Sequence, residues 1–146
     1  MKEKLYLAYG SNLNIEQMAL RCPTARLIGP AVLEGYRLVF RGGPGAAVAN
    51  IEPYTGARVP CLVWAIRETD ELALDRYEGF PFLYQKACLS VALNGKSPIR
   101  AMAYVMSGGR PMAQPSPRYL DIIAEGYRTA GFNLGLLYQS AGVRCQ

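Results

Sequence analysis

The sequence predicts an α+β fold in which a mixed, curled, barrel-like β-sheet is flanked by helices. First, strand-like runs follow one another without regularly alternating helices, which argues against a parallel α/β sheet. Second, the dipeptide Asn94-Gly95 lies between two apolar runs and strongly indicates an antiparallel hairpin. Third, the 146 residues are 51% hydrophobic and 18% charged, the balance of a globular chain of one-domain size. We therefore expect a single domain over residues 1–146.

The first elements expected are a buried strand, a turn and a short helix. Residues 5–9 are apolar and aromatic, and Gly10-Ser11-Asn12 then ends the strand in a turn. Either Asn12 or Asn14 can cap the helix that follows, and Pro23 stops it.

Strand segments are expected next. Residues 25–40 predict one bent strand or two short ones, because glycine and proline interrupt the apolar run. After a glycine-rich loop, residues 46–51 and 59–66 predict two strands, which we expect a turn at 53–56 to join.

The second half of the chain predicts a helix, a hairpin and a further helix. Thr69 is expected to cap a helix that ends at Glu78. Residues 83–93 and 99–106 are expected to form the hairpin. Ser116-Pro117 opens the last helix, because proline suits the first helical position.

The amino-acid composition excludes several chemistries. The chain contains no histidine, which removes Ser-His-Asp and Cys-His nucleophilic catalysis and most zinc sites. The cysteines show no C-x-x-C spacing, so we expect reduced thiols, buried at Cys22, Cys61 and Cys88 and exposed at Cys145. The net charge of +5 comes from 12 arginines and 4 lysines scattered singly, so we expect no nucleic-acid partner.

The beginning of the chain and its hydrophobicity predict a cytoplasmic protein. The charged residues 1–4 lead directly into the apolar run 5–9, which is too short for a signal peptide and has no small-residue cleavage site. No apolar run approaches the roughly 20 residues that a membrane helix needs. We therefore expect no membrane association.

The turn at Tyr9–Asn12 is the first candidate for chemistry. It leaves a buried strand and enters a helix, so its backbone N–H groups are expected to face a ligand at the positive end of a helix dipole, where anions bind. We expect Gly10 to adopt a positive φ there. The alternative is an ordinary strand-to-helix turn. Tyr119 lies in the first turn of the last helix, where its hydroxyl could donate a hydrogen bond to a substrate carbonyl. Core packing is the commoner role of a tyrosine.

Glu78 is the second candidate. Its place at a helix C-terminus and the aromatic residues around it disfavour its charge and are expected to raise its pKa toward neutrality (Tyr77, Phe80 and Phe82). Such a carboxyl group can act as a base and then as an acid at cellular pH. The alternative is a solvated surface carboxylate, which is what we expect of Glu71 and Asp75.

Together these segments resemble the γ-glutamylcyclotransferase family, which includes AIG2-like proteins of plants. The resemblance spans residues 5 to about 131 and rests on segments in the same order: Tyr6–Leu13, Val63–Ile66 followed by Leu74–Gly79, Tyr84, and Pro115–Leu120. It implies the barrel-like α+β fold and Glu78 as the catalytic residue. It also implies a set of substrate-binding residues: Tyr6, Leu7, Ala8, Tyr9, Gly10, Ser11, Asn12, Tyr84 and Tyr119.

The reaction that the resemblance implies suits a chain without histidine. In it the α-amine of a γ-glutamyl group attacks its own γ-carbonyl, giving 5-oxoproline and a free amine, so that no enzyme nucleophile, metal or cofactor is needed. We therefore expect a metal-independent transferase or lyase that acts on a small γ-glutamyl substrate. The leaving amine and the oligomeric state stay open, a homodimer included.

Two other functions are compatible with the sequence. One is a module of the same fold that binds a γ-glutamyl group or a small anion without turnover. The other is a thiol-dependent amide hydrolase, which would need Cys22, Cys61 or Cys88 in the pocket. Arg37 and Arg41 could help to bind an anion, although solvated strand residues are the simpler interpretation.

Overall fold

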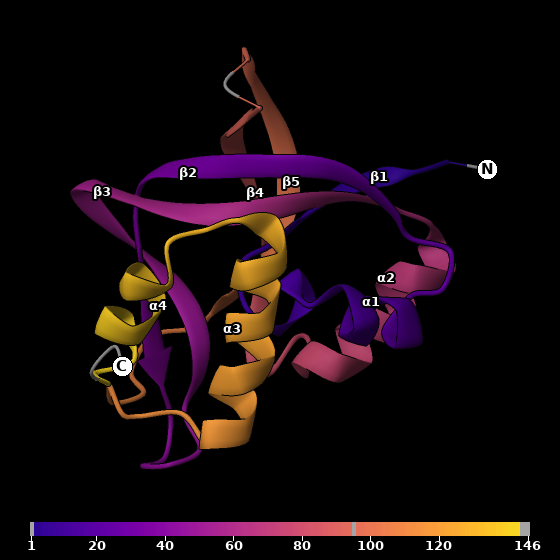
Figure 1. Ribbon diagram of the computed structural model, residues 1–146. Coiled ribbons are helices and arrows are strands. Elements are labelled where there is room, and N and C mark those ends of the chain that lie inside the picture. Colours follow the sequence, from indigo (N-terminus) through magenta and orange to yellow (C-terminus); the bar gives the residue numbers. More distant parts are fainter. Residues whose placement is uncertain (1, 95, 144–146) are drawn as a thin grey trace.

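The computed structural model describes residues 2–94 and 96–143, which form a closed barrel with helices packed on its outside (Figure 1). Around the barrel the strand order is β1-β3-β2-β4-β5. These strands are β1 (Lys4–Ala8), β2 (Arg26–Arg41), β3 (Val48–Ile66), β4 (Tyr84–Leu93) and β5 (Pro98–Met106). Strand β1 is antiparallel to β3 and parallel to β5, so the sheet is mixed. The predicted fold class is confirmed.

Helices follow β1, β3 and β5. They are the 3-10 turn η1 (Ser11–Leu13), α1 (Ile15–Arg21), α2 (Glu68–Glu78), α3 (Pro117–Ala130) and α4 (Leu134–Ser140). Asn14, not Asn12, caps α1, because its side chain accepts the N–H of Gln17. Ser116 caps α3 as expected, whereas α4 was not predicted. No helix within the described ranges is both long enough and apolar enough to cross a membrane.

The prediction of a turn at 53–56 is wrong. The segments on both sides of it pair with the same long strand, β2, and not with each other. Glu34 pairs with Arg58 and Tyr36 pairs with Pro53, so residues 54–57 bulge out of β3 opposite Gly35. The turn-forming residues therefore make a bulge inside one bent strand, since β2 is long enough to hold both halves.

Helix α2 begins two residues earlier than predicted. Its N-cap is Arg67, and Thr69 lies exposed in the first turn. The buried side chain of Asp70 accepts the Arg67 N–H at 3.0 Å and the Thr24 hydroxyl at 2.6 Å. Asp70 thus ties the start of α2 to the segment after α1.

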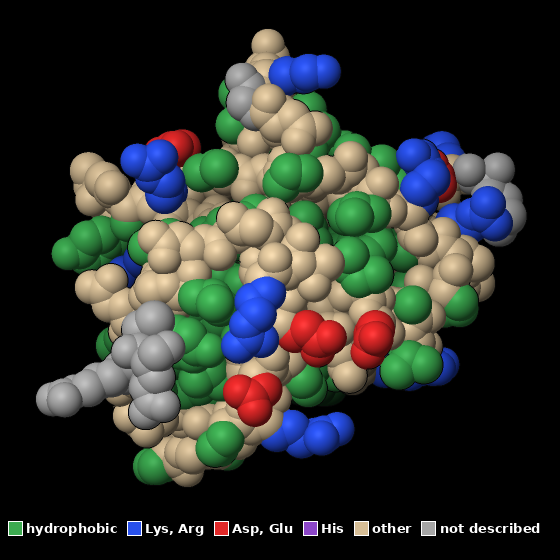
Figure 2. Space-filling model, in the orientation of Figure 1, with side chains coloured by type: hydrophobic (Ala, Val, Ile, Leu, Met, Phe, Trp, Pro, Cys, Tyr) green, Lys and Arg blue, Asp and Glu red, His purple; other side chains and the backbone are tan. Residues whose placement is uncertain are grey.

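Helix α3 packs directly on η1. Its inner face is buried through Ile123, Ala124 and Tyr127, while its outer face carries charged side chains of both signs (Figure 2). A Cβ atom at Gly126 would lie 2.7 Å from the carbonyl carbon of Leu13, so only glycine permits this approach. The contact holds η1 between α3 and the barrel.

Candidate active site

The predicted turn and Glu78 meet at one small cavity, here called the Glu78 cavity. It lies where β1 runs into η1 and where α2 ends, and its volume is about 20 Å³. Its wall consists mainly of polar and aromatic residues: Tyr6, Tyr9, Gly10, Ser11, Asn12, Ala49, Glu78, Tyr84, Tyr104 and Tyr119. Segments that are far apart in the sequence therefore converge on one carboxyl group.

Glu78 is the last residue of α2, which ends because Gly79 adopts the left-handed conformation (φ 68°). Burial raises the pKa of Glu78 to about 7, and the positive charge of Arg21 partly opposes this shift. A carboxyl group with this pKa can both accept and donate a proton near neutral pH. The predicted direction of the shift is confirmed.

The predicted surroundings of Glu78 are partly wrong. Phe82 is 85% exposed and does not line the cavity, and Tyr77 is exposed as well. Phe80 packs edge-on against Tyr104, with the ring centroids 6.5 Å apart. Glu78 is instead enclosed by tyrosines from β1, β4, β5 and α3, whose convergence depends on the closure of the barrel.

Gly10 lies where the turn comes closest to the rest of the wall. Its φ is −119°, so the predicted positive φ is wrong. The need for glycine is instead one of space, because a Cβ atom there would lie 3.1 Å from the Cβ of Ala49 and 3.7 Å from the Tyr119 hydroxyl. Any larger residue would therefore crowd the cavity.

Backbone N–H groups lie at the start of the turn that borders the cavity. The first hydrogen bond of η1 runs from the Leu13 N–H to the Gly10 carbonyl at 3.0 Å, so the N–H groups of Ser11 and Asn12 precede it. Their side chains are held by other residues. The Ser11 hydroxyl lies 2.8 Å from that of Tyr77, and the Asn12 amide donates to the Tyr6 hydroxyl at 2.9 Å.

Arg21 is a component of the site that the sequence analysis missed. Its guanidinium donates to the Asn12 side-chain oxygen and, at 3.1 Å, to that of Gln17, and it stacks on Tyr77 at 3.5 Å from the ring centroid. It thereby connects α1, η1 and α2. The available sequence signal was its place in the last turn of α1, where a basic residue suits the negative end of the helix dipole.

Tyr84 and Tyr119 bind the two backbone polar groups of the same β3 residue, Ala49. The Tyr84 hydroxyl donates to the Ala49 carbonyl, whereas the Ala49 N–H donates to the Tyr119 hydroxyl at 3.1 Å. The hydroxyl hydrogen of Tyr84 is thus engaged in a hydrogen bond within the protein. The Tyr119 hydroxyl accepts a hydrogen bond, so its own hydrogen stays available for donation. Of the two phenols, Tyr119 is the one able to donate to a ligand.

Tyr104 and Ala49 also line the cavity and were not predicted. The Tyr104 hydroxyl donates to Asp75 at 2.5 Å, and its carbonyl accepts the Tyr9 hydroxyl at 2.5 Å. Asp75 further pairs with Lys86, as does Glu71 at 2.7 Å. Asp75 and Glu71 were expected to be solvated carboxylates, and this expectation is wrong, because both belong to the network that supports Tyr104.

Several candidate residues lie outside the cavity wall. Leu7 and Ala8 are fully buried in the barrel core, and Arg37 and Arg41 share the carboxylate of Glu52. Arg41 is therefore ion-paired rather than solvated.

The described cysteines do not line the cavity either. Cys22 and Cys61 are buried, and burial raises the pKa of the Cys22 thiol to about 12. Cys88 is exposed, contrary to expectation, because it lies on the outer side of the β4–β5 hairpin. Cys145 lies outside the described residues.

Comparison with known proteins identifies the family of the chain. Residues 6–127 match the family model described as "Gamma-glutamyl cyclotransferase, AIG2-like". The chain is 32% identical over 138 residues to human gamma-glutamylcyclotransferase and 30% identical to the bovine protein, in each case covering 89% of this chain and 73% of the relative.

Solved structures show the same relationship. One named gamma-glutamyl cyclotransferase superposes with a TM-score of 0.86 at 27% identity and covers 99% of this chain and 90% of its own. A yeast gamma-glutamyl cyclotransferase specific to glutathione shares the fold, with a TM-score of 0.66, at 12% identity over 99% of this chain and 98% of its own. The chain therefore belongs to the γ-glutamyl cyclotransferase, AIG2-like family.

Proposed function

We propose that the protein converts a small γ-glutamyl amine or γ-glutamyl amino acid into 5-oxoproline and the free amine, with Glu78 as general base and then general acid. The observation that carries this proposal is that Glu78, with a pKa near 7, lines the same cavity as Gly10, Ser11 and Asn12 of the turn. The human and bovine relatives bear the name of this activity.

The proposed reaction needs two proton transfers and no group from outside. Glu78 removes a proton from the substrate's α-ammonium, and the free amine then attacks the γ-carbonyl carbon to close a five-membered ring. The ring nitrogen then loses its second excess proton, and the amide C–N bond breaks as Glu78 passes protons to the leaving nitrogen. Two protons thus move in all from the α-nitrogen to the amine, which leaves in its ammonium form, and the ring is the neutral lactam. One C–N bond forms and one breaks, so the reaction consumes no oxidant, metal or water.

The other residues of the wall have roles that follow from their hydrogen bonds. The N–H groups of Ser11 and Asn12 are suited to the substrate's α-carboxylate or to the oxyanion at the γ-carbon. The unused proton of Tyr119 is suited to the γ-carbonyl oxygen. Tyr6, Tyr9 and Tyr84 exclude water and so keep the pKa of Glu78 high.

Substrate binding must widen the Glu78 cavity. Its volume of about 20 Å³ accommodates little more than one water molecule, whereas small-molecule pockets usually measure about 300–1,000 Å³. We therefore propose that wall residues move when the γ-glutamyl group enters, and that closure around it removes water from Glu78.

A panel assay tests the proposal. The protein is incubated with γ-glutamyl dipeptides, γ-glutamyl alkylamines, glutathione and γ-glutamyl-lysine, and release of 5-oxoproline is measured by chromatography. Turnover of at least one of these substrates, lost in Glu78→Gln, is the expected result. Binding of a γ-glutamyl compound by calorimetry without turnover of any of them would instead support the non-catalytic module.

A further inference from the structure

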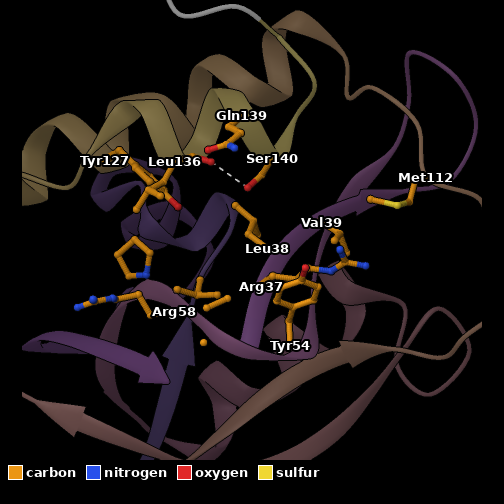
Figure 3. Close-up of a pocket in the computed structure, with 14 residues that line it drawn as sticks. Arg37, Leu38, Val39, Tyr54, Arg58, Met112, Tyr127, Leu136, Gln139 and Ser140 are labelled. Carbon is orange, nitrogen blue, oxygen red and sulfur yellow. Dashed lines mark hydrogen bonds between the residues drawn. The ribbon is translucent and has the colours of Figure 1, made fainter. Parts of the chain in front are cut away.

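A second pocket lies between α4, β2 and the bulge of β3, and we call it the Tyr127 pocket (Figure 3). It shares no lining residue with the Glu78 cavity. Its volume is about 500 Å³, within the range of small-molecule sites. Much of its lining is apolar and comes from Leu38, Val39, Val59, Pro60, Met112 and Leu136.

Tyr127 brings a buried polar group to this pocket. The residue is fully buried, and its ring packs edge-on against Phe132 at 5.7 Å between centroids. In Figure 3 its side chain extends from α3 toward Leu38 and Arg58. Among the described residues its hydroxyl finds no hydrogen-bond partner. A buried hydroxyl without a partner is costly, which points to an acceptor or donor that a ligand supplies.

Arg37 provides a second buried polar group. Its Nε atom is buried and has no partner in the described part of the chain, while its guanidinium stacks over Tyr54 at 4.7 Å. Among the described residues, the carboxylate that pairs with Arg37 is that of Glu52, which lies 3.7 Å from the Arg37 guanidinium. Arg41 binds both oxygens of the same carboxylate. A single carboxylate therefore serves two guanidinium groups, and positive charge is left over.

The remaining lining adds positive charge. Arg58 lies at the edge of the pocket and makes no ion pair with any described residue, and the lining contains no Asp or Glu. In Figure 3, Arg58 and Tyr127 lie at one end, Arg37 with Tyr54 at the other, and Leu38 between them. The polar groups are thus separated by an apolar stretch.

We propose that the Tyr127 pocket binds a small organic carboxylate with an apolar body. The carboxylate accepts from Arg37, the body lies over Leu38 and Leu136, and an acceptor atom at the far end receives the Tyr127 hydroxyl. Planar guanidinium groups suit a carboxylate, which they can bind with two parallel hydrogen bonds. This site is independent of the reaction proposed above, because neither cavity contributes a residue to the other.

Two fluorescent probes test the proposal. Dansylglycine has a naphthalene body, sulfonyl oxygens and a carboxylate, whereas dansylamide lacks the carboxylate. We expect saturable one-to-one binding of dansylglycine, with an enhanced and blue-shifted emission, and binding of dansylamide that is weaker by about tenfold. Equal binding of the two probes, or no saturable binding of dansylglycine, would overturn the proposal.

Variants locate the probe. We expect Tyr127→Phe and Arg37→Gln each to weaken dansylglycine binding by about threefold to tenfold. Leu136→Trp and Ser140→Trp fill the pocket and should each abolish binding. With two such variants, the test can still be made if one of them does not fold. Arg128→Gln, an exposed α3 residue outside the lining, is the matched control. Undiminished binding in the folded filling variants would show that the probe lies elsewhere and would refute the site.

Discussion

The Glu78 cavity and the Tyr127 pocket differ in size and in how fully their polar groups are bonded. The first offers about 20 Å³, and the hydroxyls of Tyr9, Tyr84 and Tyr119 in its wall bond to the backbone. The second offers about 500 Å³ and leaves the Tyr127 hydroxyl and the Arg37 Nε without a described partner. Only the smaller one contains a carboxyl group, and its pKa is strongly raised.

The difference shows that the larger hollow need not be the reactive one. Reactivity depends on a titratable group whose environment shifts its pKa and on donors fixed around it, and both are found in the small cavity. The large pocket has space and unsatisfied donors, which suit binding but provide no proton acceptor. The predictions below test whether the small cavity is the reactive site.

The largest effect is expected for Glu78→Gln. The amide keeps the shape of the side chain but cannot accept the α-ammonium proton, so we expect turnover to fall by about 10² to 10⁴. Dansylglycine binding at the Tyr127 pocket should be unchanged. Glu68→Gln, an exposed residue of the same helix, is the control and should keep full turnover. Near-normal turnover in Glu78→Gln would show that Glu78 is not the base.

A smaller loss is expected for Gly10→Ala. The new methyl group would lie 3.1 Å from the Cβ of Ala49 and should hinder the approach of the substrate to the turn, reducing kcat/KM by about 10- to 100-fold. Gly43→Ala is the matched control, because no atom lies within 4 Å of its added methyl. Steady-state kinetics on both variants make the comparison. Equal kinetics for the two would remove Gly10 from the site.

The two tyrosines that bind Ala49 should respond differently. Tyr119→Phe removes a phenol whose proton is free, so we expect kcat/KM to fall by about tenfold. Tyr84→Phe removes a proton already donated to the Ala49 carbonyl, and should lower the melting temperature more than it lowers kcat/KM. Thermal melts and kinetics of both variants measure the difference, and the opposite order would contradict the assigned hydrogen bonds.

Glu78 should also make stability depend on pH. Its pKa is about 7 in the folded protein and about 4.5 in an unfolded chain, so between these values the folded state holds more protons. The wild type should therefore lose stability relative to Glu78→Gln as the pH rises from about 4.5 to 7, by on the order of 3 kcal/mol, and lose no more above that. Urea unfolding at several pH values tests this. A pH-independent difference would mean that Glu78 titrates normally.

No effect is expected from a chelator or a thiol reagent. The chain has no histidine, and the proposed reaction uses only a carboxyl group and hydrogen-bond donors. Turnover should therefore survive EDTA, and also iodoacetamide, which can reach the exposed Cys88 outside the cavity. Activity that EDTA abolishes and zinc or magnesium restores would contradict the mechanism.

Local patterns along the chain were sufficient for most of the fold. Short segments of sequence predicted three of these elements: the helix that ends at Glu78, the hairpin between residues 83 and 106, and the helix α3 capped by Ser116. Such predictions hold in the folded protein because turns, caps and alternating hydrophobicity depend on residues that are close in the sequence. The candidate residues of the turn and Glu78 could be named for the same reason, together with the family resemblance.

Contacts between distant segments decided the rest. The bulge of β3 exists because β2 is long enough to pair with both halves, and no local pattern records the length of a partner strand. Three features of the site depend on how the barrel closes: the tyrosines that bury Glu78, the hydrogen bonds of Tyr84 and Tyr119 to the Ala49 backbone, and the link through Arg21. The pKa of Glu78 depends chiefly on burial, and burial is a property of the assembled barrel rather than of the helix that carries the residue.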